Sequence, residues 1–104
     1  MTYSSFEECW DAICRRLFPK PRLYCWSAAG RAKGFFGVTL IGHEGITVRT
    51  GKGLRFVPRR DFEALFPLWL DYKAGMIPRV KLNFIVNTTY VLSIFHWLEL
   101  QPMS

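Results

Sequence analysis

The residues of this chain that could do chemistry are its cations, because they outnumber the acids and lie together. The formal net charge is +6. The excess is confined to the stretch from Lys20 to Arg60, where nine lysines and arginines accompany a single acid, Glu44. On either side of this stretch the acids slightly outnumber the bases. Such a distribution predicts one surface that meets an anionic partner.

Within the basic stretch, the segment Gly51–Gly53 predicts a three-residue loop between two strands of a hairpin. In this register Arg49 lies across from Arg55 on one face, and Val48 lies across from Phe56 on the other. The next two arginines open a helix, where free backbone amides favour an anion. The resulting basic rim would bind a phosphodiester backbone through counterion release. The candidate nucleic-acid-binding residues are Arg31, Lys33, Arg49, Lys52, Arg55, Arg59 and Arg60.

A structural interpretation of these basic residues is also open. Basic side chains on exposed strands also protect sheet edges and keep a protein soluble, and nearby acids could neutralise them. No helix-turn-helix, zinc-finger, RRM or KH signature accompanies the charge. Aromatic residues in the strands could stack on bases, but aromatic residues in strands are more often part of a core, and we expect that here. These aromatic residues are Tyr24, Trp26, Phe35 and Phe56.

The sequence does not favour an enzyme, and no catalytic residue, metal or cofactor is predicted. His43 lies in a turn beside Glu44, and His96 precedes Glu99 by three residues, which is typical of a pair on a helix surface. Three cysteines make an odd count without a C-x-x-C pair, as is usual for reduced cytosolic thiols. Their spacing with His43 matches no common zinc site, and a nucleophilic pairing of the third cysteine with His43 lacks support. The cysteines are Cys9, Cys14 and Cys25.

The elements that must position these residues follow from periodicity and turn chemistry. A capping box at Ser5 and Glu8 begins a helix over about residues 5–18. A helix from Arg60 to Ala74 ends at Gly75, and Pro67 either kinks it or starts a second helix after a break. We expect a single domain, 1–104, of the α+β class. Its N-terminal helix precedes an antiparallel meander of three to four strands, and two or three further helices pack on one sheet face. The expected strands are 22–27, 35–41, 46–50 and 54–57; residues 76–84 are not assigned, and a last helix covers 89–100.

The last helix is apolar almost all round, with a narrow polar stripe of Ser93, His96 and Glu99. Such a helix must be buried on two sides. We expect another copy of the chain to supply the second cover, which predicts a homodimer. Alternatively, a different protein docks there, or the N-terminal helix and the sheet enclose the helix completely. The candidate interface residues are Tyr90, Val91, Ile94, Phe95, Trp97 and Leu98.

The C-terminal two-thirds combines a strand pair, the segment Pro58–Glu63 at the start of an aromatic helix, and the segment Asn87–Tyr90 at the start of a final helix. In these motifs and in size, the chain resembles small orphan proteins of bacterial mobile integron gene cassettes. The resemblance covers about residues 44–99 and implies an α+β fold and a bacterial cytoplasmic setting. That group has no common activity to carry over.

These observations predict a non-catalytic interaction module. We expect it to be homo-oligomeric through its last helix, with the basic hairpin binding nucleic acid or another polyanion. One alternative is an accessory protein that binds a different protein through that helix. Another is a small-molecule binder with an aromatic-lined pocket. Neither a signal peptide nor a membrane-spanning segment is predicted, so we expect a cytoplasmic protein.

Overall fold

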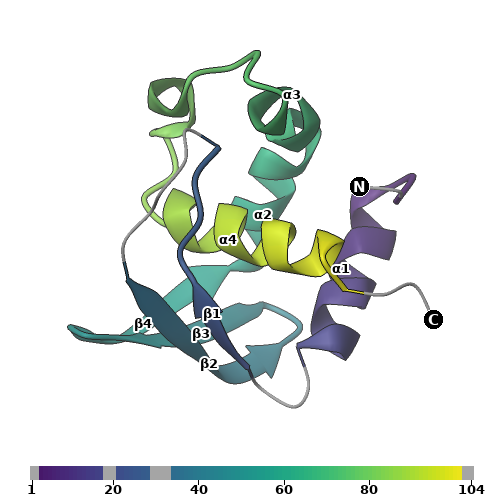
Figure 1. Cartoon of the computed structure of the whole chain (residues 1–104). Coiled ribbons are helices and arrows are strands. Elements are labelled where there is room, and N and C mark those ends of the chain that lie inside the picture. The colour runs from purple at the N-terminus through teal and green to yellow at the C-terminus, as the bar shows by residue number, and fades with distance from the viewer. Residues whose placement is uncertain (1–2, 18–20, 29–33, 102–104) are drawn as a thin grey trace.

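The computed structural model describes residues 3–17, 21–28 and 34–101. An N-terminal helix is followed by an antiparallel sheet, and the remaining helices pack on that sheet (Figure 1). The predicted α+β class is therefore confirmed. In chain order the elements are α1 (Phe6–Arg16), β1 (Arg22–Tyr24), β2 (Phe35–Gly42), β3 (Gly45–Thr50), β4 (Gly53–Pro58), α2 (Arg59–Leu65), the 3-10 turn η1 (Phe66–Leu68), α3 (Trp69–Lys73), the 3-10 turn η2 (Arg79–Leu82) and α4 (Thr88–Glu99).

The sheet is a four-stranded meander in which each strand pairs with its sequence neighbour, in the order β1-β2-β3-β4. Its two faces differ sharply. One carries apolar side chains that the helices cover, with α4 crossing above the strands (Figure 1). The other, which we call the outer face, carries exposed residues. The buried side chains of the inner face are Leu23, Phe36, Val38, Ile46, Val48 and Val57.

Helix α1 begins where the capping signal places it. The Ser5 hydroxyl accepts a hydrogen bond from the Glu8 amide at 3.3 Å, which satisfies one free donor of the first turn. The Glu8 carboxylate accepts hydrogen bonds from the hydroxyl and the amide of Ser4, one residue earlier than in an ideal capping box. The inward side of α1 includes Trp10 and Ile13, both buried against the rest of the core.

The β3–β4 hairpin differs from the predicted register by one residue. Thr50 pairs with Gly53, so the loop contains two residues rather than three, and Arg49 lies opposite Leu54 instead of Arg55. The Thr50 hydroxyl accepts a hydrogen bond from the Lys52 amide and donates one to the Gly53 carbonyl, which closes this tighter turn. Because the side-chain period of a strand is two, the shift places Arg49 and Arg55 on opposite faces of the sheet.

Strand β1 ends at Tyr24, three residues earlier than predicted. The Trp26 amide donates to the Ser93 hydroxyl of α4 at 2.9 Å, and the Ala28 amide donates to the Tyr72 hydroxyl at 3.1 Å. These backbone groups therefore satisfy their hydrogen bonds with helices rather than with a neighbouring strand. The segment ties the edge of the sheet to α4 and α3.

The predicted helix 60–74 is divided at Pro67. Helix α2 ends at Leu65, the turn η1 holds Pro67 in its first turn, and α3 continues from Trp69. A proline is tolerated in a first turn because that position needs no amide donor. Gly75 ends α3 with a φ of 81°, as predicted from its position. The unassigned segment 76–84 contains the turn η2.

Helix α4 runs through the middle of the protein, and most of its apolar surface is buried by the chain itself. It contacts α1, α2 and β1. Four of the predicted interface residues are therefore core residues, which removes the physical reason for a second copy on this helix. The fully buried members are Val91, Ile94, Phe95 and Leu98, while Tyr90 and Trp97 are half-buried.

Candidate functional site

The outer face of the sheet is arranged in cross-strand rows, which follow from the pairing register. One row contains Arg22, Gly37, Arg49 and Leu54 on the four successive strands. In the neighbouring row on one side, Tyr24 of β1 pairs with Phe35 of β2. The neighbouring row on the other side of the arginine row consists of Leu40, Thr47 and Phe56. A row with two arginines thus lies between two rows that contain aromatic rings.

The aromatic rings of this face are open to solvent, contrary to the expectation that they form the core. Tyr24 is 76% exposed, and Phe35 and Phe56 are each 52% exposed. The Phe56 ring packs closely over Gly45 of the neighbouring strand β3. A Cβ added at Gly45 would lie only 2.6 Å from this ring. Trp26, the fourth aromatic residue considered, instead stacks on His96 of α4.

The charge on this face has one sign. The described strands contain no aspartate or glutamate, and no carboxylate of the described residues pairs with Arg22 or Arg49. The Arg22 guanidinium lies 4.6 Å above the centre of the Phe35 ring, and that ring meets Tyr24 edge-on at 6.3 Å. A cation over an aromatic face is favourable and orients both groups. The face therefore combines positive charge with rings suited to stacking.

A second basic feature lies at the tip of the β3–β4 hairpin. A hollow of about 520 Å³ is lined there by Lys52 and Arg55, together with Phe35 and Tyr90. Arg55 points to the inner side, with its guanidinium 5.9 Å from the centre of the Tyr90 ring. Because Phe35 belongs both to this hollow and to the outer face, the two basic regions are continuous.

Two further predicted binding residues, Arg59 and Arg60, lie away from this surface. Arg59 forms an ion pair with Glu7 and lies over the rings of Phe6 and Trp10, so it joins α2 to α1. Arg60 is exposed but lines a different groove, beyond the end of β4. Arg31 and Lys33 lie outside the described residues. Of the five candidates within the described residues, Lys52 and Arg55 line one hollow, while Arg49 lies on the outer face.

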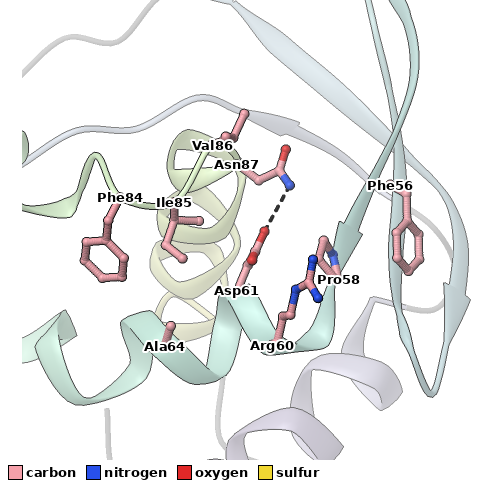
Figure 2. A pocket seen from close by; sticks show the side chains of 9 residues that line it. All are labelled: Phe56, Pro58, Arg60, Asp61, Ala64, Phe84, Ile85, Val86 and Asn87. Carbon is pink, nitrogen blue, oxygen red and sulfur yellow. Dashed lines mark hydrogen bonds between the residues drawn. The ribbon is translucent and has the colours of Figure 1, made fainter.

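A wider groove of about 900 Å³ lies beyond the far end of β4 (Figure 2). Its polar side is formed by Arg60 and Asp61 of α2, and the Asn87 amide donates to the Asp61 carboxylate at 3.0 Å. Its apolar rim includes Phe84 and Val86, together with Phe56, which also belongs to the outer face. The groove has the size of a small-molecule site, which makes it the place that the small-molecule alternative indicates. Arg60 and Asp61 bring opposite charges to this groove, so its lining is less basic than the outer face.

The thiols and histidines do not assemble into a reactive site. Burial raises the pKa of Cys9 to about 12, and burial also raises the pKa values of Cys14 and Cys25. A raised pKa keeps a thiol protonated and unreactive at neutral pH. Across residues 3–17, 21–28 and 34–101, no group of three or more histidine, cysteine, aspartate or glutamate residues is placed to hold a metal ion.

The surroundings of His96 predict a fold whose stability depends on pH. Its ring stacks on Trp26, with ring centres 4.3 Å apart. Burial lowers its pKa below the ordinary 6.5, Glu99 opposes this shift, and Lys73 adds to it. The unfolded chain therefore binds the proton more readily than the folded one. We expect the free energy of unfolding to decrease as the pH falls through 6.5, and to be highest above it.

The measurement is chemical denaturation at a series of pH values with His96→Phe as the comparison. Phenylalanine keeps an aromatic ring against Trp26 but does not titrate. The variant should lose this part of the pH dependence. A variant with the wild-type slope would assign the acid sensitivity to the carboxylates instead.

One signal in the sequence points to the exposed aromatic residues. In β1, Leu23 separates Arg22 from Tyr24, so strict alternation places the arginine and the tyrosine on the same face. The same reasoning places Phe35 and Gly37 together, because the buried Phe36 lies between them. Alternation does not reveal which face of the sheet the helices cover. The prediction placed the aromatic residues on the covered face, but Tyr24, Phe35 and Phe56 lie on the exposed one.

Comparison with protein-family models, with curated proteins and with solved structures finds no match to this chain. The resemblance to integron cassette proteins therefore stays a prediction, and no activity is transferred from a relative. Of the helices in the described part of the chain, none has the length and apolar character needed to cross a membrane.

Proposed function

We propose that this protein is a non-catalytic module that binds single-stranded nucleic acid on the outer face of its sheet. The observation that carries the proposal is the row containing Arg22 and Arg49, flanked by aromatic rows on strands without an acidic residue. Arginines attract phosphates, and exposed rings stack on bases of any sequence. A duplex keeps its bases stacked inside, so rings on a sheet face favour single strands.

The hairpin tip extends this surface. Lys52 and Arg55 line a hollow that also contains Phe35 of the outer face. A nucleic-acid strand that crosses the sheet would therefore reach two further cations. The fold offers no comparable reason to place the ligand on α4, whose predicted interface residues Val91, Ile94, Phe95 and Leu98 are buried. Self-association through that helix is therefore not part of the proposal.

The proposal predicts that Arg49→Glu weakens binding to a fluorescently labelled oligothymidine by about tenfold, because one phosphate contact becomes a repulsion. Arg49 makes no described ion pair, so the fold should tolerate the change. The measurement is fluorescence anisotropy at low and moderate salt, with a duplex of matched length alongside. Wild-type binding should weaken steeply with salt and should favour the single strand.

Arg15→Glu is the matched control, because Arg15 is an exposed arginine on α1 and its reversal changes the net charge equally. If both variants lose the same affinity, net charge rather than the outer face is responsible. If wild-type protein does not bind at low salt, the proposal is wrong. Light scattering adds a further outcome: a stable dimer disrupted by changes at Leu54 or Phe56 would make this face a protein interface.

A further inference from the structure

Gly37 occupies an unusual place for a glycine. It lies inside the eight-residue strand β2, between the buried side chains of Phe36 and Val38, and its own face is the outer one. A glycine inside a strand destabilises it, since it loses more backbone entropy on folding and packs no side chain. Such a position needs a local reason.

The usual structural reasons do not apply to Gly37. Its φ is not positive, unlike those of Gly34, Gly45, Gly53 and Gly75, so its backbone conformation suits any residue. A Cβ added at Gly37 would meet no atom within 4 Å, so no neighbouring group requires its absence. Gly45 shows the contrast, because a Cβ there would clash with a ring and a carbonyl. The register of β2 is irregular between Val38 and Leu40, but Gly37 itself pairs with Arg22 and Arg49, so Gly37 is not the bulged residue. Another role of a strand glycine is to let something outside the chain come close.

The neighbours of Gly37 indicate what that is. Arg22 on β1 and Arg49 on β3 are its direct cross-strand partners, so their Cα atoms lie about 10 Å apart with only a glycine between them. The Phe35 ring, two residues along the same strand, contacts the Arg22 guanidinium. Two arginines in register on either side of a glycine, neither of them ion-paired with a described carboxylate, suit a phosphate, because arginine binds phosphate oxygens in a fork geometry.

We infer that the open position at Gly37 receives a phosphate group of the ligand, held between Arg22 and Arg49 while an adjoining base stacks on Phe35. The inference rests on the proposed function and specifies it: the ligand is a phosphodiester strand that crosses the sheet along this row. Gly37 contributes space and no hydrogen bond of its own. A side chain there would fill the position that the phosphate occupies.

The test is Gly37→Val, with Gly42→Val as the matched control. Gly42 lies on the same strand and the same face, lacks a positive φ, and would make only an ordinary contact of 3.8 Å with a carbonyl. Valine suits a strand, so Gly37→Val should fold with unchanged or higher stability in chemical denaturation. It should bind oligothymidine at least about tenfold more weakly than wild type. Gly42→Val should bind as wild type does.

Equal affinity of Gly37→Val and wild type would overturn the inference while leaving the proposed function intact. If valine disturbs the fold, Gly37→Ala provides the smaller obstruction and should give a smaller loss of the same sign. A second measurement separates the two claims: titration of wild-type protein with inorganic pyrophosphate, followed by amide NMR. If pyrophosphate shifts the Gly37 amide resonance but oligothymidine does not bind, the phosphate position is supported and the proposed function is contradicted. If the resonance does not shift and oligothymidine does not bind, the phosphate position and the proposed function are both contradicted.

Discussion

Truncation of Phe95 to alanine should lower the free energy of unfolding by about 3–5 kcal/mol, which is the usual cost of removing a buried phenylalanine ring. Phe95 is fully buried on α4, and its ring packs against Phe62, Phe66 and Trp69 with centre distances of 5.6–6.5 Å. The loss of one ring leaves a cavity among three others that cannot easily close. Guanidinium unfolding followed by fluorescence measures the effect.

The same variant decides between two roles for the helix. The sequence predicted Phe95 as an interface residue, in which case its truncation would release subunits without unfolding them. Leu100→Ala serves as the control, because Leu100 lies just beyond α4 and is 68% exposed. It should change the unfolding free energy by less than about 0.5 kcal/mol. A Phe95→Ala protein that keeps wild-type stability but loses a dimer would contradict the core assignment.

Replacement of Tyr24 and Phe35 together by alanine should cost about 2–6 kcal/mol of binding free energy for oligothymidine, at about 1–3 kcal/mol for each stacked base. Both side chains are largely exposed, so the fold should lose little. The salt dependence should persist in the double variant, because the arginines that contact phosphates remain. Anisotropy titrations at several salt concentrations separate the two quantities.

The matched control for this experiment is Phe84→Ala. Phe84 is an exposed ring, 62% accessible, but it lies on the groove beyond β4 rather than on the outer face (Figure 2). Its loss should leave nucleic-acid affinity unchanged. If Phe84→Ala weakens binding and the double variant does not, the ligand lies in that groove and the outer face is not the site.

Local signals predicted most of the fold because they depend on single residues. Ser5 begins α1 and Gly75 ends α3, and each acts through its own backbone or hydroxyl. The hairpin register was wrong because it depends on the difference between a two-residue and a three-residue loop, and Gly51–Gly53 permits both. The hydroxyl of Thr50 favours the shorter loop, which is a contact that pattern alone does not reveal.

The candidate site was only partly predictable for a related reason. The excess of cations could be counted, but their grouping depends on which strand face is covered and on tertiary partners. Glu7 lies 52 positions before Arg59 in sequence and forms an ion pair with it, so Arg59 does not contribute to the basic surface. Arg49 was placed on an exposed face, and Arg55 was assigned to the same face only because the register was shifted.

The arrangement of α4 also sets an order of events during synthesis. The meander pairs only sequence neighbours, so the sheet can form early from short loop closures. Its inner face, however, is covered in part by α4, the last helix of the described residues, which also contacts α1 near the beginning. Until residues 88–99 have left the ribosome, the apolar inner face lacks the part of its cover that α4 supplies, and this exposed surface favours aggregation or chaperone binding in that interval.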